Sequence, residues 1–307
     1  MFKIFDAHCD TVTTAISKGE KLRKNNLHND IERLAEFEKA VQVFAIWFDK
    51  EDCENLYESA ERAIDFFKKQ ADENRDIFNV IYNGEELEKS RNVGGILSIE
   101  GCEILEGNKE NISRLYEKGI RIMTICWNYE NELGYGAATE IKKGLKKFGM
   151  ECVEEMNRCG IIADISHLNE QGAYDVCQRA EKVIASHSNA KRVCGHLRNL
   201  TDEQIKMIKE KNGMIGINLY PPFLSEDTKA GIYDIEKHIE HISEIAGENN
   251  IGFGCDFDGI DDVPENISSI SDIYKVRDAI ERDFGEKFAD KIFFDNFYEY
   301  MKIYIGG

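Results

Sequence analysis

The sequence predicts an α/β protein built as a single (β/α)8 barrel of the TIM type, and three observations lead to this prediction. First, the chain contains eight apolar, strand-like runs when counted generously, at residues 2–5, 41–48, 94–99, 120–127, 160–165, 182–185, 214–218 and 252–255. Second, several of these runs are continuously hydrophobic, which is typical of parallel strands covered by helices. Third, amphipathic segments separate them, at residues 54–69, 141–158, 170–181 and 202–211. Strands that alternate with helical patterns indicate βα units and a parallel sheet.

The barrel is expected to occupy the whole chain as one domain, residues 1–307. A typical barrel has about 250 residues, so there is room for a helical, aromatic-rich extension at about residues 272–307. This extension is expected either to cover the barrel or to form a subunit contact. A ninth apolar run, at residues 78–82, is expected to be peripheral. The helix at 202–211 should begin with a capping box, Thr201-Asp202-Glu203-Gln204.

The composition argues against several classes of protein. With 42% hydrophobic residues the chain can bury a sizeable core, and its net charge of −19 disfavours binding to nucleic acid or to an anionic membrane surface. No apolar run approaches the ~20 residues of a membrane helix. The first apolar run begins at Phe2, which leaves no room for a signal peptide before the first motif. We therefore expect a cytoplasmic protein with reduced thiols, since its nine cysteines are odd in number and form no Cys-x-x-Cys.

The most informative feature is that acidic or imidazole side chains follow five of the strand-like runs. The five segments are Asp6-Ala7-His8-Cys9-Asp10, Ser98-Ile99-Glu100-Gly101, Asp164-Ile165-Ser166-His167, Ser186-His187-Ser188 and Gly254-Cys255-Asp256-Phe257-Asp258-Gly259. A (β/α)8 barrel gathers residues from the ends of different strands at its catalytic face. Imidazole nitrogens and carboxylate oxygens both bind zinc well. The pattern therefore predicts a site for one or two zinc-like ions.

Each of the ligand candidates has its own signal. His8 and Asp10 lie two residues apart, so a strand turns both side chains to one face. Glu100 ends a buried run, where a carboxylate needs a cation or strong hydrogen bonds, and its two oxygens can bridge two metals. His167 and His187 end consecutive runs 20 residues apart, which is the length of one βα unit.

Three further polar residues near these ends each have two open interpretations. One of Asp256 and Asp258 is expected to be a ligand or general base, and the other a supporting or turn-forming residue. Arg198 follows His187 by 11 residues in a loop before a capped helix. Its guanidinium either grips a substrate carboxylate bidentately or ties down its own loop.

Several cysteines and histidines are expected to be structural. Cys9, Cys126 and Cys255 lie close to the predicted site, but strand alternation turns Cys9 and Cys255 away from the face of their acidic or imidazole neighbours. His238 and His241 share a helix face, and the charged residues around them predict that this face is solvated surface.

In their order and spacing, these segments resemble the motifs of the renal (membrane) dipeptidase family of zinc metallopeptidases. The resemblance runs from Asp6 to about Asp262 and includes one further motif, Arg198-Asn199-Leu200-Thr201-Asp202. It implies two zinc ions with Glu100 as a bridging ligand. The other ligands that it implies are His8 and Asp10 for one ion, and His167 and His187 for the second.

The resemblance also implies roles for residues around the metals. Asp256 resembles the acid/base carboxylate of the family. Arg198 resembles the residue that binds the terminal carboxylate of the substrate, with Tyr220 as its weaker helper. The chain departs from the renal enzymes at Trp127, where those enzymes have a substrate-contacting His. Asn128 is the candidate substitute as donor to the scissile carbonyl.

The resemblance therefore implies a dinuclear zinc dipeptidase that tolerates a D-residue at the C-terminal position, and the expected location stays cytoplasmic. Two alternatives stay open. The same site would suit another metal-dependent amidohydrolase reaction, such as deacylation or lactone opening. A non-catalytic metal- or peptide-binding protein would use the same ligands. The expected partners are a dipeptide substrate and a second copy of the chain in a homodimer, with no nucleic acid and no membrane.

Overall fold

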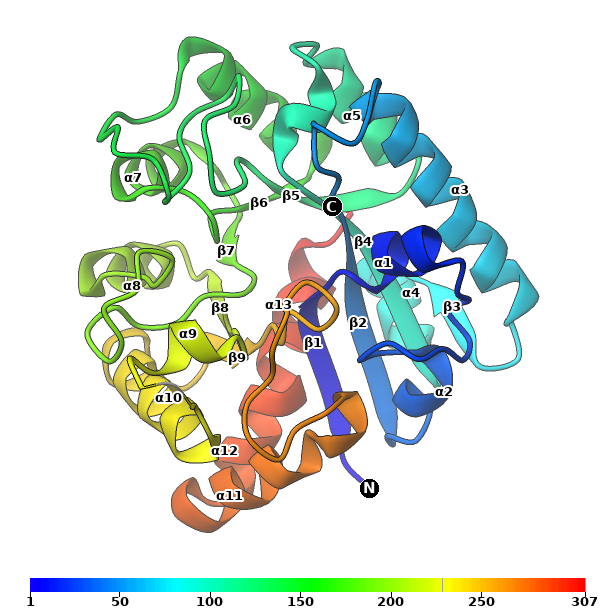
Figure 1. Cartoon of the computed structure of the whole chain (residues 1–307), viewed down its shortest axis with the longest axis vertical. Coiled ribbons are helices and arrows are strands. Elements are labelled where there is room, and N and C mark those ends of the chain that lie inside the picture. The colour runs from blue at the N-terminus through cyan, green and yellow to red at the C-terminus, as the bar shows by residue number, and fades with distance from the viewer. Residues whose placement is uncertain (228, 307) are drawn as a thin grey trace.

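The computed structural model describes residues 1–227 and 229–306, and its central feature is a closed barrel of eight parallel strands (Figure 1). In spatial order, the ring contains β1 (Lys3–Cys9), β2 (Lys39–Ile46), β4 (Val93–Glu100), β5 (Ile120–Thr124), β6 (Ile162–Asp164), β7 (Val183–Ala185), β8 (Met214–Ile217) and β9 (Ile251–Phe253). The ring closes because β1 pairs with both β2 and β9, and β2 pairs with β4. The predicted (β/α)8 architecture is confirmed.

All strand pairs of the ring are parallel, so the carboxyl ends of the strands lie at one end of the barrel. The longest ladder joins β2 to β4, in register from Ala40 opposite Val93 to Ile46 opposite Ile99. The pairing of β1 with β2 shifts register between Asp6 and Cys9. An irregularity of this kind re-aims side chains.

Several strand ends differ from the prediction: β1 continues to Cys9, four residues beyond the predicted end, and β9 stops at Phe253, two residues before it. β2 ends at Ile46 and β5 ends at Thr124, so Trp47 and Trp127 lie in the loops that follow these strands. The ninth run forms β3 (Phe78–Val80), which pairs with β4 at the edge of the described sheet and lies outside the ring, as predicted for a peripheral strand.

Helices connect the strands and surround the barrel (Figure 1). They are α1 (Thr11–Lys18), α2 (Ile31–Leu34), α3 (Leu56–Glu73), α4 (Gly84–Lys89), η1 (Cys102–Leu105), α5 (Glu110–Glu117), α6 (Lys147–Cys159), α7 (Glu170–Arg179), α8 (Asp202–Glu210), α9 (Pro221–Leu224) and α10 (Ile232–Ala246). The helix predicted from residue 141 begins only at Lys147, which leaves a loop before α6. The capping box of α8 is confirmed, since the Thr201 hydroxyl accepts from the Gln204 amide and the Thr201 amide donates to the Gln204 side chain.

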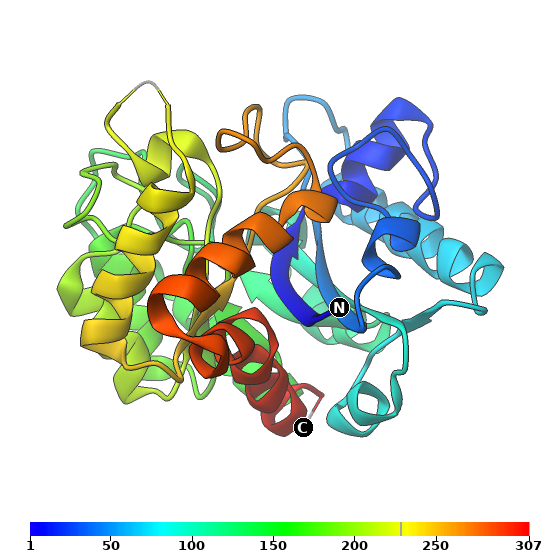
Figure 2. The same cartoon turned by 90° about the horizontal axis from the view of Figure 1, so that it is seen from below.

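The C-terminal segment covers the amino-terminal end of the barrel. It contains η2 (Ile270–Asp272), α11 (Tyr274–Phe284), α12 (Glu286–Asp290), the π-helical turn η3 (Lys291–Asp295) and α13 (Asn296–Tyr304). The Phe297 ring stacks on Phe5 of β1 at 5.5 Å, and the Phe293 ring packs on Phe253 of β9 at 4.5 Å. In Figure 2 these helices, coloured orange to red, run from the middle of the view to its lower edge. The first of the two predicted roles, covering the barrel, is therefore confirmed. Within the described residues, no helix combines the length and apolar character needed to cross a membrane.

Candidate metal centre and active site

Three histidines converge on Glu100 at the carboxyl ends of four strands. The carboxylate oxygens of Glu100 face different imidazoles: Oε1 lies 2.7 Å from Nε2 of His167 and 3.6 Å from Nε2 of His187. The other oxygen, Oε2, lies 3.3 Å from Nε2 of His8. A carboxylate with one oxygen toward each of two ligand groups has the arrangement of a bridging ligand. The sequence predicted these four residues from strand ends alone, and the structure brings them together.

Two more carboxylates complete the cluster on the side of His8. Asp10 Oδ2 lies 3.3 Å from His8 Nε2, and Asp256 Oδ1 lies 3.7 Å from the same nitrogen. Two sets of ligand atoms each fall within 4.8 Å of one another, namely His8 with Glu100 and His187, and His8 with Asp10 and Asp256. All of these residues are buried. The donor set, imidazole nitrogen with carboxylate oxygen, fits zinc-like ions.

The tautomers of His167 and His187 provide a test of whether the site fits a cation. Nδ1 of His167 lies 2.9 Å from Oδ1 of Asn128, which can only accept a hydrogen bond. Nδ1 of His187 lies 2.8 Å from the Ser186 hydroxyl, which already donates its proton to Asp164. Both Nδ1 atoms therefore carry the proton, and the two Nε2 lone pairs face each other at 2.8 Å. Positive charge is needed between such lone pairs, and metal-binding histidines are held in this way by their second nitrogen.

Burial controls the ionisation of the cluster. It raises the pKa of Glu100 to about 8, with the charge of Asp10 adding to the effect, and raises the pKa of Asp256 to about 7. Burial also lowers the pKa of His167 and of His187 well below the ordinary range. For His8, burial lowers the pKa, but Glu100 and Asp10 outweigh it, so the net pKa lies well above the ordinary value. A divalent cation would reverse the penalty on the ionised carboxylates.

Asp164 is the supporting residue for which sequence reasoning had proposed no role. Its carboxylate accepts hydrogen bonds from both the amide and the hydroxyl of Ser166, at 3.0 and 2.6 Å. It also accepts from the amide and hydroxyl of Ser186, at 2.9 and 2.6 Å, and from the Thr124 hydroxyl at 2.7 Å. Asp164 thus joins the ends of three strands and orients His187 through Ser186. The sequence signal that could have indicated this role is the position of Asp164 within the apolar segment that ends at His167.

Replacement of Asp164 by Ala is expected to lower the free energy of unfolding by roughly 3–5 kcal/mol, because each buried donor left without an acceptor costs about 1–3 kcal/mol. Metal affinity should fall about 10- to 100-fold, the usual cost of losing a partner behind a ligand. Denaturant titration and metal titration would measure the two effects. Asp164→Asn, which keeps the shape and one acceptor oxygen, should lie between Ala and wild type. Equal stability of Asp164→Ala and wild type would contradict the role.

A cavity of about 300 Å³ opens onto the cluster. It is lined by Asp10, Thr13, Thr14, Trp47, Glu100, Trp127, Asn128, His167, Tyr220, Phe223, Asp256, Asp258, Gly259, Ile260 and Asp261. The rings of Trp47 and Trp127 lie 4.9 Å apart, and Trp127 stacks over His167 at 6.1 Å. Trp127 therefore forms part of the cavity wall. Asn128 also lines the cavity, but its side-chain oxygen is already bonded to His167.

The two aspartates of the last motif separate into different roles. Asp256 lies beside the cluster, held by a 2.8 Å hydrogen bond from the Asn218 amide. Asp258 instead accepts from the Thr11 hydroxyl and the His28 amide, both at 2.6 Å, which ties down the turn. Both residues have left-handed backbone, with φ of 65° and 70°. Strained backbone of this kind clusters at functional sites.

Arg198 is buried without a hydrogen-bond partner. Its side chain lies over the Phe223 ring, 5.4 Å from the centroid, and within the described residues none of its three side-chain nitrogens forms a hydrogen bond. Burial lowers its pKa to about 10, and the charges of Asp256 and Glu100 oppose this shift. The guanidinium is therefore still charged at neutral pH and has donors directed at no acceptor. Tyr220 packs against the same Phe223 ring, at 4.9 Å, and lines the metal cavity.

The expected structural residues are mostly confirmed. Cys9 and Cys255 are buried in the hydrophobic core, and the Cys126 thiol donates to Asn131. The prediction for His238 is wrong, because its side chain is fully buried. Nδ1 of His238 accepts from the Ala190 amide at 3.0 Å, and Nε2 donates to the Leu224 carbonyl at 3.0 Å.

Comparison with known proteins identifies the family. The model of the membrane dipeptidases, Peptidase family M19, matches residues 1–303. The chain belongs to this family. Among M19 structures, that of dipeptidase AC, a metallopeptidase, superimposes with a TM-score of 0.91 at 26% identity, over 100% of this chain and 99% of that one. The family resemblance found in the motifs is confirmed.

Other relatives differ in length or are more distant. An uncharacterized dipeptidase of Schizosaccharomyces pombe, C965.12, is 27% identical over 80% of this chain, but the match spans only 64% of its own length. A second from that yeast, C3A11.10c, is 33% identical over 58% of this chain and 45% of its own length. A metallopeptidase from Rhodobacter sphaeroides, solved with a phosphinate mimic of L-Ala-D-Ala, shares the fold with a TM-score of 0.89 at 24% identity, over 99% of each chain. The chain thus spans under two thirds of the length of the two yeast relatives.

Proposed function

We propose that this M19 protein is a zinc-dependent dipeptidase with two ions per chain, Glu100 bridging them. The observation that carries the proposal is the arrangement of Glu100, whose two oxygens face separate imidazole groups beside the cavity. His8 and Asp10 would hold one ion, and His167 and His187 the other. Zinc bound there would polarise the scissile carbonyl and supply a water of lowered pKa.

Asp256 is proposed to move the proton during hydrolysis. It accepts a proton from the attacking water and delivers it to the nitrogen of the leaving amino acid, so the proton lost by the nucleophile is gained by the leaving group. The position of Asp256 supports this role: it lines the cavity, lies 3.7 Å from His8 Nε2, and is held by the hydrogen bond from the Asn218 side chain.

The substrate is proposed to be held by both of its termini. The unpartnered guanidinium of Arg198 binds the C-terminal carboxylate, with Tyr220 as its helper, since a planar fork matches a carboxylate bidentately. Asp10 lies on the cavity wall and is proposed to face the free α-amine. Asn128, which also lines the cavity, is proposed to contribute to substrate binding. Anchors at both ends would restrict substrates to dipeptides.

The tolerance of a D-residue at the C-terminal position is proposed from family membership. The alternative on the same site is another metal-dependent amidohydrolase reaction, deacylation or lactone opening. A panel of L-Xaa-L-Xaa and L-Xaa-D-Xaa dipeptides, N-acyl amino acids and lactones, tested on zinc-loaded protein of known metal content, separates these reactions. Turnover confined to acyl amino acids or lactones would refute the dipeptidase assignment. Zinc binding without turnover of any of them would indicate a non-catalytic protein.

Replacement of Arg198 by Ala is expected to lower kcat/KM for free dipeptides by roughly 10- to 150-fold, because a hydrogen bond to a charged group contributes about 1.5–3 kcal/mol. Dipeptides with an amidated C-terminus should be poor substrates of the wild type and should change little in the variant. Arg198→Lys should restore only part of the loss, since an ammonium makes no bidentate fork. If free and amidated dipeptides lose activity equally, Arg198 supports its loop and does not bind the carboxylate.

A further inference from the structure

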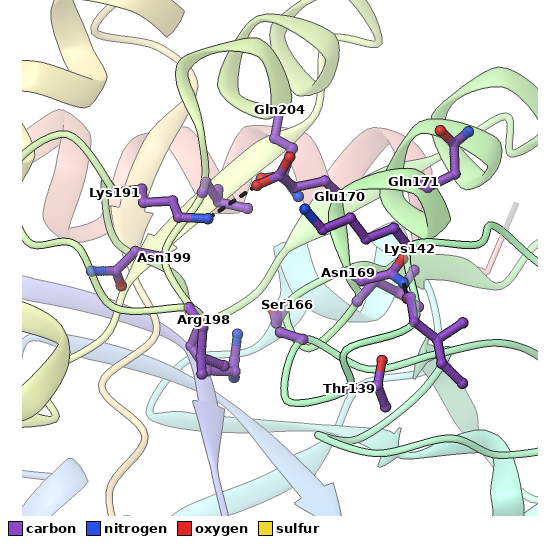
Figure 3. Close-up of a pocket in the computed structure, with 15 residues that line it drawn as sticks. Thr139, Lys142, Ser166, Asn169, Glu170, Gln171, Lys191, Arg198, Asn199 and Gln204 are labelled. Atoms are coloured by element: carbon purple, nitrogen blue, oxygen red, sulfur yellow. Dashed lines mark hydrogen bonds and ion pairs between the residues drawn. The ribbon is translucent and has the colours of Figure 1, made fainter.

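A second cavity, of about 390 Å³, lies beside Arg198 and separate from the metal cavity. Three parts of the chain build most of it: the loop before α6, the stretch from Ser166 after β6 to the start of α7, and the loop between β7 and α8 (Figure 3). We name it the Arg198 pocket and define it by Thr139, Lys142, Ser166, Gln171, Lys191 and Arg198. Ser166 is the direct neighbour of His167, so the pocket reaches to within one residue of the metal ligands.

Arg198 forms part of the wall of this pocket, and its guanidinium has no hydrogen-bond partner among the described residues. Arg198 is only 4% exposed, and Nε, Nη1 and Nη2 lack hydrogen-bond partners. Leaving a buried charged donor unsatisfied is costly, so an acceptor is expected to meet it. Figure 3 shows the Arg198 side chain at the edge of the pocket next to Ser166. A carboxylate bound to Arg198 therefore has this pocket open beside it.

The lining of the pocket is positively charged in a chain of net charge −19. Arg198, Lys142 and Lys191 bring three positive charges, and only Lys191 is paired, at 3.0 Å with Glu170. In the described part of the chain, Lys142 forms no ion pair. The lining therefore carries an excess of two positive charges. The metal cavity, by contrast, is lined by Asp10, Glu100, Asp256, Asp258 and Asp261.

We propose that the Arg198 pocket receives the side chain of the C-terminal residue of the substrate and selects an acidic one, aspartate or glutamate. This inference rests on the proposed dipeptidase function, which places the α-carboxylate at Arg198. An acidic side chain is repelled by the carboxylates of the metal cavity and attracted by Lys142, the positive charge of the lining that stays unpaired once Arg198 holds the α-carboxylate. Thr139 and Gln171 add hydroxyl and amide groups to the same lining.

The decisive experiment compares two dipeptides that differ only in charge, Ala-Glu and Ala-Gln, with the C-terminal residue tested as both L and D isomers. In zinc-loaded wild type, kcat/KM should favour Ala-Glu by about 2- to 5-fold, in the range expected for an exposed charge pair. The preference should shrink as salt is added, because exposed charges are screened. A ratio at or below one in the wild type overturns the inference.

Two variants and a matched control locate the preference in the pocket. Lys142→Gln removes this unpaired charge and should bring the Glu:Gln ratio close to one. Gln171→Glu adds a negative charge to the same lining and should lower the ratio as well. Lys143→Gln removes a neighbouring exposed lysine that is not among the pocket-lining residues, and should leave the ratio unchanged. Equal ratios in Lys142→Gln and Lys143→Gln would overturn the assignment to this pocket.

The experiment distinguishes an error in the assignment of the Arg198 pocket from an error in the proposed dipeptidase function. Hydrolysis of both dipeptides without a preference refutes the pocket and leaves the dipeptidase intact. If neither dipeptide is hydrolysed, the proposed function is wrong. Calorimetric binding of the same two dipeptides then tests whether the Arg198 pocket prefers an acidic side chain. Equal binding, or no binding of either, overturns it, whereas tighter Ala-Glu binding that is lost in Lys142→Gln supports it.

Discussion

Loss of the Glu100 carboxylate is expected to reduce hydrolysis by about 10³-fold or more and to lower the zinc content below two ions per chain. The physical reason is that Glu100 is the residue whose two oxygens face both imidazole groups. In Glu100→Gln one of those oxygens becomes an amide NH₂ that cannot bind a metal. Metal catalysis of this kind contributes several kcal/mol, and each 1.4 kcal/mol is tenfold in rate.

The measurement is elemental analysis of protein reconstituted with zinc, alongside kcat/KM for one dipeptide. Chelation of wild type should abolish activity, and added zinc should restore it in wild type only. Glu103→Gln is a matched control, because Glu103 is a largely enclosed carboxylate just beyond the end of the same strand, bonded to Asn131 and not to the cluster. It should keep its zinc and its activity. Wild type that binds at most one zinc tightly after reconstitution would count against the dinuclear proposal.

Replacement of Asp256 by Asn is expected to lower kcat by ~10²–10⁴-fold, the usual contribution of general acid–base catalysis. The amide keeps the shape of the side chain and an acceptor for the Asn218 amide, but it cannot take a proton from water. Zinc content and the unfolding transition should therefore stay near wild type. Asp262→Asn, an exposed acid in the following loop, is the control and should retain full activity.

Two results would change the role of Asp256. An Asp256→Asn variant with unaltered kcat would exclude it as the proton carrier. A variant that loses zinc in proportion to its activity would make Asp256 a metal ligand, which the 3.7 Å distance to His8 also allows. Measuring metal content and kcat on the same sample separates these outcomes.

The barrel and the ligand cluster were predictable because strand order and ligand identity are both local signals. A run of apolar residues followed by His or Glu places a ligand at the end of a strand, and the closed ring then brings the strand ends together. Glu100, His167 and His187 were found in this way. The exact ends of strands are not local signals, since the hydrophobic runs continue through Trp47 and Trp127 although the ladders stop earlier.

The partners behind the ligands could not be predicted, because they come from other strands. The carboxylate of Asp164 accepts hydrogen bonds from Ser186 at the end of the next strand and from Thr124 of the preceding strand. No spacing in the sequence indicates that these residues are partners. His238 was assigned to the surface because its sequence neighbours are charged. On the helix, however, His238 shares its face with Ile235 and Ile242, which are both buried. The residues three and four positions away on the helix determine whether His238 is buried, and the charged residues adjacent in sequence do not.

The position of the tryptophans has an optical consequence. The chain contains two tryptophans, and both Trp47 and Trp127 line the metal cavity, with their rings 4.9 Å apart. Indole emission therefore originates only from the wall of this cavity. A ligand that displaces water from these rings should shift the emission to shorter wavelength or quench it. Entry of an unlabelled dipeptide into an inactive variant can thus be followed in real time, with the protein as its own fluorophore.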